Sequence, residues 1–270
     1  MLDWTQLVFL ALIQGLSEFL PISSSAHLVL PGQLLGWRDQ GLLFDVAVHG
    51  GTLGAVLLYF RADIVQLIQG LFPARITNTN SWVDAEIWKF AVATLPVVIA
   101  GLLLSDLIET RLRGLAVIAT TTLVFGLLLG WAAWKSRSND SSELQQVTWR
   151  DAIVIGLFQV MALVPGVSRS GITLTAAMLL GYNSATAARF SFLLSIPVIL
   201  GAITFMSAEW FGGAIPSVPA SQLLLAMLIS GVSAYATIAI FLDLLQRVGL
   251  MPFVLYRLIL GSALVLFLIF

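Results

Sequence analysis

The longest uncharged run of the chain constrains its fold more than any other sequence feature. Trp210 to Leu242 is a run of 33 residues without Asp, Glu, Lys or Arg, and a helix needs only about 20 apolar residues to cross the hydrocarbon core of a bilayer. The runs from Gly114 to Trp134 and from Phe190 to Ala208 are also long enough. With 59% hydrophobic and 10% charged residues, the chain carries more apolar surface than a soluble domain of this size buries. The sequence therefore predicts an all-α polytopic membrane protein.

Charge and cysteine content exclude several classes of function. The net charge is -1 and the chain has no cysteine. A chain without a basic surface is not expected to bind nucleic acid, and its expected partners are membrane lipids. The absence of cysteine excludes disulfides, thiol nucleophiles and cysteine-ligated metals. No Lys or Arg precedes the first apolar run and no small-residue cleavage site follows it, so no removed signal peptide is predicted.

The first apolar segment is too short to cross the membrane. Trp4 to Phe19 is 16 residues long, about 24 Å of helix, and Pro21 ends it. Serines 23–25 are candidate N-caps for a second short segment, His27 to Trp37. Two half-length helices that meet at a polar turn predict a re-entrant hairpin over residues 4–37. Such irregular backbone is tolerated at membrane depth only where it is buried in protein or lines a wet cavity.

The same arrangement recurs 145 residues later in the chain. The matching pairs are Trp4 with Trp149, Gln14 with Gln159, Ser23 with Ser168, and Ser25 with Ser170. The polar turn recurs as LVPGVSRSGIT, residues 163–173. We therefore predict one integral membrane domain made of two repeats, residues 1–138 with the hairpin 4–37 and residues 149–270 with a hairpin over 150–181.

Three crossings are expected to follow each hairpin. They are predicted near residues 44–68, 88–105 and 114–134 in the first repeat, and near 185–206, 220–243 and 252–270 in the second. An odd number of crossings per repeat inverts the second repeat relative to the first. Inverted repeats with broken helices place their binding site at the repeat interface, so the two polar turns are expected to approach each other from opposite sides of the membrane.

Basic residues predict the orientation in the membrane. If the first hairpin opens outward, eight Lys and Arg residues lie on the cytoplasmic side and three lie outside. The eight are Arg61, Arg75, Lys89, Lys135, Arg137, Arg150, Arg189 and Arg247, and the three are Arg38, Arg111 and Arg113. Because cytoplasmic loops carry the excess of Lys and Arg, both termini are predicted to lie outside, on the side to which the first hairpin opens.

Both polar turns have the features of a phosphate site. Each turn opens a helix, and the free N–H groups and dipole of a helix N-terminus favour phosphate. Arg169 in the second turn is a permanent cation whose fork matches phosphate oxygens. The candidate phosphate-binding residues are Ser23, Ser25, Ser168, Arg169, Ser170 and Thr173. In an alternative interpretation, Arg169 forms a structural pair with Glu18.

The first turn adds groups suited to phosphoryl chemistry. Gln14 and Glu18 are four residues apart and share a helix face, and His27 follows Ser24 by three residues. Glu18, Ser24, His27 and Arg169 are therefore the candidate catalytic residues. Glu18, with Gln14 beside it, is a candidate ligand for a divalent cation such as Mg²⁺. Ser24, His27 and water all remain candidates for the nucleophile.

His49 lies within the first predicted crossing. It either lines a cavity or is a hydrogen-bonded interior histidine, and the sequence favours neither. The glycines at positions 50, 51 and 54 permit close helix packing, which allows a homodimer without requiring one.

The two turn motifs carry a family resemblance. QGLSEFLPISSSAH, residues 14–27, and PGVSRSGIT, residues 165–173, resemble the signatures of the undecaprenyl-diphosphate phosphatase family, the bacitracin-resistance type of bacterial membrane phosphatase, and the likeness extends over essentially the whole chain. The resemblance implies hydrolysis of undecaprenyl diphosphate to undecaprenyl phosphate for peptidoglycan synthesis. It implies an outward-facing site in the bacterial plasma (inner) membrane that depends on Mg²⁺ or Ca²⁺. The residues it implicates are Glu18, Ser24, His27, Ser168, Arg169, Ser170 and Thr173.

Two positions depart from the family pattern. Gln14 occupies the first position of the E/Q-x-x-x-E motif, and Ala26 stands where glycine is common. Gln14 neither acts as a base nor supplies negative charge to a metal, so Glu18 is the one carboxylate of the motif. The inverted repeat also motivates a competing function, a transporter that carries polyprenyl phosphate between leaflets, and the least specific alternative is a structural membrane subunit.

Overall fold

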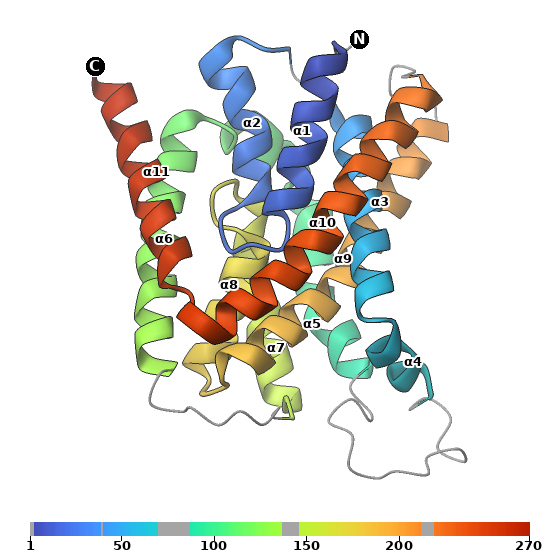
Figure 1. The fold of residues 1–270 in the computed structure, drawn as a ribbon, viewed down its shortest axis with the longest axis vertical. Coiled ribbons are helices and arrows are strands. Elements are labelled where there is room, and N and C mark those ends of the chain that lie inside the picture. The colour runs from blue at the N-terminus through green and yellow to red at the C-terminus, as the bar shows by residue number, and fades with distance from the viewer. Residues whose placement is uncertain (1–2, 39, 70–86, 137–145, 212–218) are drawn as a thin grey trace.

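Helices are the regular structure of the chain wherever the computed structural model describes it, namely residues 3–38, 40–69, 87–136, 146–211 and 219–270 (Figure 1). The helices of the first half are α1 (Trp4–Ser17), α2 (Ser24–Leu35), α3 (Leu42–Tyr59), α4 (Arg61–Gln69), α5 (Ile87–Arg111) and α6 (Leu115–Ser136). Those of the second half are α7 (Trp149–Val160), the 3₁₀ turn η2 (Met161–Leu163), α8 (Arg169–Leu179), α9 (Ser184–Phe211), α10 (Ala220–Val248) and α11 (Met251–Ile269). The predicted all-α class is confirmed.

The long helices have the length and surface of membrane spans. Within the described residues, α5, α6, α9, α10 and α11 are long and apolar enough to cross a bilayer, and the bent pair of α3 and α4 would be a sixth span. Large apolar side chains on these helices are exposed, among them Leu103, Leu127 and Ile269. A large exposed apolar surface is unfavourable in water and is typical of a surface that contacts lipid. The prediction of a polytopic membrane protein is therefore confirmed.

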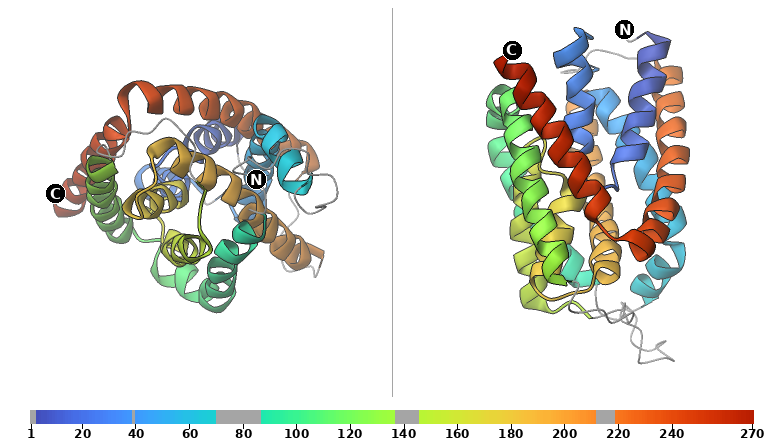
Figure 2. Two further views of the ribbon diagram at one scale, coloured as in Figure 1. Left: turned by 90° about the horizontal axis from the view of Figure 1, so that it is seen from below. Right: turned by 60° about the vertical axis from the view of Figure 1, so that its left-hand side comes forward.

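Two pairs of short helices occupy the predicted hairpin segments. α1 and α2 form the first pair, and α7 and α8, with η2 between them, form the second. Seen from one end, α7 and α8 lie in the middle while α5, α6, α10 and α11 lie around them (Figure 2). Every residue of α8 from Ser170 to Met178 is buried. The inversion of one repeat relative to the other stays a prediction, and the expected repeat boundary near residue 138 lies outside the described residues.

The first crossing is not the single straight helix expected over residues 44–68. α3 and α4 meet at Phe60 with a bend of 75°. An ion pair between Asp63 of α4 and Arg189 of α9 holds the bent segment, and the Arg189 guanidinium lies 5.8 Å from the Phe60 ring centroid. A hydropathy pattern does not reveal such a break, because the residues that hold α4 come from a distant helix.

Glycines bring α1 and α3 unusually close to α10. A Cβ at Gly51 would overlap the carbonyl oxygen of Met227 and the hydroxyl of Ser230, and a Cβ at Gly15 would overlap the Ser233 side chain. Close approach of this kind requires residues without a side chain. Gly15 lies three residues before Glu18 and Gly51 two residues after His49, so these contacts fix the backbones that carry both side chains.

The start of α1 and the end of α11 lie at the same end of the bundle, and α4 lies at the other (Figure 1). This arrangement agrees with the prediction that both termini are on one side of the membrane. The side itself stays a prediction. Arg75 and Arg137, two of the basic residues behind that prediction, lie outside the described residues.

Candidate active site

The two polar turns are in direct contact. The Gly166 amide donates to Oγ of Ser23 at 3.0 Å, and Oγ of Ser170 donates to the Leu20 carbonyl at 2.9 Å. The sequence placed these turns together although they are separated by more than half the chain, and the structure brings them together. The first turns of α2 and α8 therefore begin at one shared place inside the bundle.

Ser23 and Ser168 cap these two helices in the same unusual conformation. Their φ angles are 76° and 72°, and within the described residues no other non-glycine residue has a positive φ. Each side chain accepts a hydrogen bond from the amide three residues on, Ala26 at 3.5 Å and Gly171 at 3.1 Å. The cap satisfies one amide of each first turn, and the amides before it have no intrahelical partner because they begin the helix. Backbone strain of this kind is found at functional sites.

The second turn is pressed against α6. Gly166 has a φ of +93°, and a Cβ there would lie 2.8 Å from the Ile118 carbonyl oxygen and overlap the Thr121 hydroxyl. That hydroxyl donates to the Pro165 carbonyl at 2.7 Å. Both the conformation and the space require glycine, so the glycine of the PGVSRSGIT motif has a structural reason.

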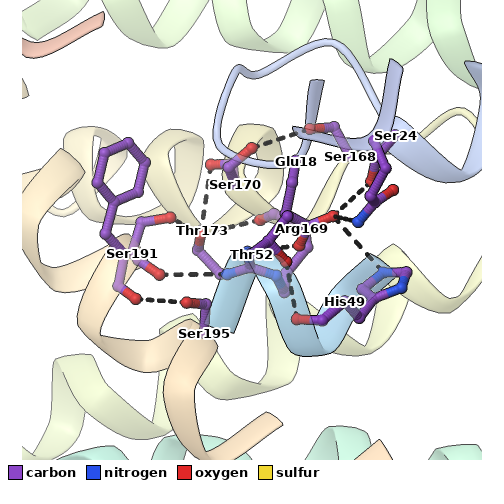
Figure 3. Close-up of polar contacts among 12 residues, drawn as sticks. Glu18, Ser24, His49, Thr52, Ser168, Arg169, Ser170, Thr173, Ser191 and Ser195 are labelled. Carbon is purple, nitrogen blue, oxygen red and sulfur yellow. Dashed lines mark hydrogen bonds and ion pairs between the residues drawn. The ribbon is translucent and has the colours of Figure 1, made fainter. Parts of the chain in front are cut away.

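Glu18 is the centre of the polar network. Its side chain is buried, and Oε1 accepts from Nη2 of Arg169 at 3.0 Å. Oε2 accepts from Nε2 of Gln14 at 2.9 Å and from Oγ of Ser24 at 2.6 Å (Figure 3). The structural pair that the sequence offered as an alternative is therefore present. The ion pair with Glu18 uses Nη2 of Arg169. Nη1 of the same guanidinium donates to the Ser191 carbonyl at 3.3 Å.

A pocket of about 170 Å³ opens at this network. Its polar lining comes from Glu18, Ser23, Ser24, Ser25, His49, Ser168 and Arg169, and its apolar lining from Ala162, Val198, Ile199 and Ala202. The volume is small, of the order of a compact polar group, and a long apolar chain does not fit inside it. Val198, Ile199 and Ala202 of α9 form most of the apolar side of the pocket.

His27 does not line this pocket. Its Nδ1 donates to the Ser23 carbonyl at 2.7 Å and its Nε2 lies 2.6 Å from the Tyr256 hydroxyl. The two rings also stack with centroids 5.7 Å apart. His27 therefore contacts the first turn from outside the pocket and connects it to α11, and its predicted catalytic role stays a prediction.

His49 is the histidine that lines the pocket. Its Nδ1 donates to the Asp45 carbonyl, so Nε2 is the nitrogen that faces the network, 3.6 Å from Oε2 of Glu18. Hydrogen bonds fix the neighbouring backbone: Ser230 donates to the Val48 carbonyl at 2.8 Å and Thr52 donates to the His49 carbonyl at 2.9 Å. The sequence left the role of His49 open, and the structure places it beside Glu18.

Ser170 and Thr173 lie behind the pocket rather than in its lining. Both are almost fully buried. Thr173 Oγ1 is 2.7 Å from Ser191 Oγ (Figure 3), and Ser170 holds the Leu20 carbonyl. Their hydroxyls connect α8 to α9 and to the first turn. Their predicted contact with phosphate stays a prediction.

The predicted metal ligands, Glu18 and Gln14, provide one carboxylate and one amide. The described residues contain no group of three or more His, Cys, Asp or Glu side chains that could hold a metal. Oε1 of Gln14 is buried and has no hydrogen-bond partner, although its amide nitrogen donates to Glu18. The amide nitrogen of Gln14, and not Oε1, faces Glu18, so rotation of the amide would be needed to turn Oε1 toward the carboxylate. One carboxylate with one amide oxygen suits Mg²⁺ or Ca²⁺ that takes its remaining ligands from phosphate oxygens and water, and cation binding stays a prediction.

Arg257 is a buried cation that the sequence reasoning missed. It lies in α11 with 0% exposure and donates to carbonyls of both turns, Pro21 at 3.1 Å and Gly166 at 2.7 Å. The signal was present, because an ionisable residue inside an apolar crossing is a candidate functional residue.

Comparisons with known proteins cover both turns and the whole pocket. Residues 7–263 match the family described as bacitracin resistance protein BacA. The chain is 52% identical to the undecaprenyl-diphosphatase of Hahella chejuensis over 268 residues, which covers 99% of each chain. It is also 52% identical to the undecaprenyl-diphosphatase of Saccharophagus degradans over 263 residues, 97% of each chain.

Proposed function

The chain belongs to the bacitracin resistance protein BacA family, and on this premise we propose that it hydrolyses undecaprenyl diphosphate to undecaprenyl phosphate and inorganic phosphate. Two relatives that are 52% identical over nearly the whole chain are named undecaprenyl-diphosphatase. The chain is accordingly a phosphatase, and the membrane provides its lipid substrate. The competing transporter function is not favoured, because these relatives are named for a hydrolytic activity.

The hydrogen bond from Ser24 to Glu18 carries the proposal for the reaction. Ser24 Oγ donates to Oε2 of Glu18 at 2.6 Å, and both residues line the pocket. A carboxylate in this position accepts the hydroxyl proton as the oxygen attacks phosphorus. The bond between Ser24 Oγ and the terminal phosphorus forms, the bridging P–O bond breaks, and undecaprenyl phosphate leaves. Water then attacks the phosphoserine, inorganic phosphate leaves, and Ser24 recovers its proton from Glu18.

Arg169 and the two helix beginnings supply the positive potential for this step. The Arg169 guanidinium lines the pocket and contacts Glu18 and the Ser191 carbonyl. The helices α2 and α8 begin at Ser24 and Arg169, so their N-terminal amides lie near the same pocket. Preorganised donors of this kind stabilise the charge of a transferring phosphoryl group. Ser23, Ser25 and Ser168 line the same pocket and complete the proposed phosphate grip.

A divalent cation, Mg²⁺ or Ca²⁺, would be held by Glu18 and, after rotation of the amide that now donates to Glu18, by Oε1 of Gln14. When bound, it neutralises part of the diphosphate charge. One carboxylate does not bind such an ion strongly by itself, so the substrate supplies most of the ligands.

The proposed setting is the bacterial plasma membrane, with the pocket and both termini facing outward. The excess of Lys and Arg on the opposite side supports this orientation. The predicted homodimer receives no support from Gly50 and Gly51, because both pack against α10 within the chain, and it stays a prediction.

Phosphate release from undecaprenyl diphosphate by the purified protein tests the function. We expect release that depends on a divalent cation, and a wild-type protein without this activity would overturn the proposal. Substrate labelled in the terminal phosphate tests the nucleophile, since quenching should trap labelled protein in the wild type and none in Ser24→Ala. Full turnover by Ser24→Ala would assign the attack to water instead.

A further inference from the structure

The Arg257 side chain donates hydrogen bonds to backbone carbonyls of both polar turns. It is fully buried in α11, and within the described residues no carboxylate forms an ion pair with it. Its guanidinium donates only to backbone carbonyls. These are Thr122 at 3.3 Å, Pro21 at 3.1 Å, Val167 at 3.0 Å, Thr121 at 3.5 Å and Gly166 at 2.7 Å.

The accepting carbonyls belong to three segments that must hold together for the pocket to exist. Pro21 lies on the first turn, just before the Ser23 cap. Gly166 and Val167 lie on the second turn, just before the Ser168 cap. Thr121 and Thr122 lie on α6, against which the second turn is pressed. One side chain therefore contacts both turns and their common support, while it does not itself line the pocket.

The chemistry of these contacts requires arginine. The guanidinium has five N–H donors in a fixed plane, whereas a lysine ammonium has three. A buried cation without a paired carboxylate is costly and is retained only where its donors are fully used. The Arg257 guanidinium contacts carbonyls that come just before the first turns of α2 and α8. Its positive charge therefore adds to the positive potential of the proposed phosphate grip.

We propose that Arg257 is the positioning residue of the phosphate grip: it sets the spacing of the two turns and thereby the distance between Ser24 and Arg169 across the pocket. The inference rests on the proposed function for the identity of the substrate. Its geometric part, that one guanidinium holds the two turns in register, stands on the hydrogen bonds alone.

Arg257→Lys is the first test variant, because it keeps the charge and removes donors. A lysine leaves at least two of the carbonyls unpaired, and the turns separate. A misplacement of about 1 Å costs roughly 100-fold in rate, so kcat/KM should fall by about 100-fold. Arg247→Lys is the control, since Arg247 is exposed and pairs with Asp243 on its own helix; it should retain wild-type turnover.

Two glycines of α6 provide a second test that leaves Arg257 in place. A Cβ at Gly126 would lie 3.0 Å from Cβ of Arg257, whereas a Cβ at Gly130 would lie 3.1 Å from Cγ1 of Val254. Both alanine variants therefore crowd the same interface between α6 and α11 to the same extent. Gly126→Ala should displace Arg257 and lower kcat/KM by about tenfold or more, because a misplaced group reduces the rate. Gly130→Ala meets Val254 instead and should leave kcat/KM unchanged.

Two further measurements separate positioning from a general loss of stability. Amide hydrogen exchange should increase in the peptides that cover residues 18–27 and 163–173 of Arg257→Lys, and not in the peptides of α5 or α10. The affinity for inorganic pyrophosphate should fall in the same variant. A uniform increase in exchange, or activity lost only in proportion to unfolded protein, would show a purely structural role and overturn the proposal.

The outcomes also separate this inference from the proposed function. If the wild type releases no phosphate from undecaprenyl diphosphate, the proposed function fails. The amide hydrogen exchange and the pyrophosphate affinity of Arg257→Lys then still test the positioning role of Arg257, because neither measurement needs turnover. If the wild type is active and Arg257→Lys and Gly126→Ala match it in kcat/KM, the positioning role fails while the function stands.

Discussion

Nη2 of Arg169 lies 3.0 Å from Oε1 of Glu18, so two residues 151 positions apart in the chain form one ion pair between the hairpins. The same carboxylate accepts the Ser24 hydroxyl through its other oxygen. A phosphate that reaches Arg169 therefore competes with Glu18 for the guanidinium. If phosphate takes the guanidinium, Glu18 loses its ion pair and keeps the hydrogen bonds from Ser24 and Gln14. In the proposed function, Glu18 would therefore connect substrate binding at Arg169 with activation of Ser24.

Substitution of Arg169 by lysine should weaken substrate binding more than it affects folding. Lysine keeps the charge but loses the planar fork that contacts Glu18 and, in the proposed function, would contact phosphate at the same time. We expect the affinity for the diphosphate to fall by about 10- to 100-fold, the value of one charge-assisted hydrogen bond. Binding of inorganic pyrophosphate measured by calorimetry checks this result, and unchanged affinity would contradict the assignment of Arg169 to the phosphate grip.

Substitution of Glu18 by glutamine should remove turnover while the pocket stays intact. Glutamine preserves the shape and loses the base, and general-base catalysis contributes about 100- to 10,000-fold. Phosphate release measures the loss. Asp243→Asn is the matched control, because that carboxylate is exposed and pairs with Arg247 on its own helix. Equal activities of the two variants would exclude Glu18 from the reaction.

The two histidines should respond differently to substitution. His49→Gln removes the ring nitrogen that faces the pocket and should lower kcat by about 100-fold with an unchanged midpoint of thermal unfolding. His27→Gln removes the connection between the Ser23 carbonyl and Tyr256 and should lower both the unfolding midpoint and turnover. Thermal unfolding and phosphate release on the same preparations distinguish the two; wild-type kcat in His49→Gln would contradict a role for this residue in the pocket.

Two glycines of α3 form a matched pair for stability. A Cβ at Gly51 would overlap Met227 and Ser230, whereas a Cβ at Gly54 meets nothing within 4 Å. Gly51→Ala should reduce the free energy of unfolding by about 2 kcal/mol through overpacking. Gly54→Ala should be neutral or stabilising, since alanine favours a helix by about 1 kcal/mol over glycine. Thermal unfolding in detergent compares them, and equal stability would contradict the close contact of α3 with α10.

Gln14 is the position at which the metal requirement can be changed. Chelation of divalent cations should abolish phosphate release, and Mg²⁺ or Ca²⁺ should restore it. Gln14→Glu places a second carboxylate beside Glu18, and added ligand charge increases cation affinity. The cation concentration for half-maximal activity should therefore fall. An activity that persists in excess chelator would remove Glu18 and Gln14 from a metal-binding role.

The sequence predicted those features that depend on residues close together in the chain. The apolar runs, the serine caps and the repeated turn follow from local composition and spacing. The all-α membrane class is confirmed, and short helices occupy both predicted hairpin segments. Glu18, Ser24 and Arg169, chosen for their chemical character beside a helix start, all line the pocket. The bend at Phe60 was missed, because Asp63 and Arg189, which hold α4, lie 126 residues apart.

By itself, the sequence determined that the chain is a helical membrane protein with two polar turns suited to phosphate, because hydropathy, capping and charge act over a few residues. Only the tertiary structure decided which side chains share the pocket. The rotation of α3 brings His49 rather than His27 to Glu18, and the crossing of α11 brings Arg257 to both turns. Rotation and crossing of helices are set by contacts between distant segments, such as Gly51 with α10, and no local pattern encodes them.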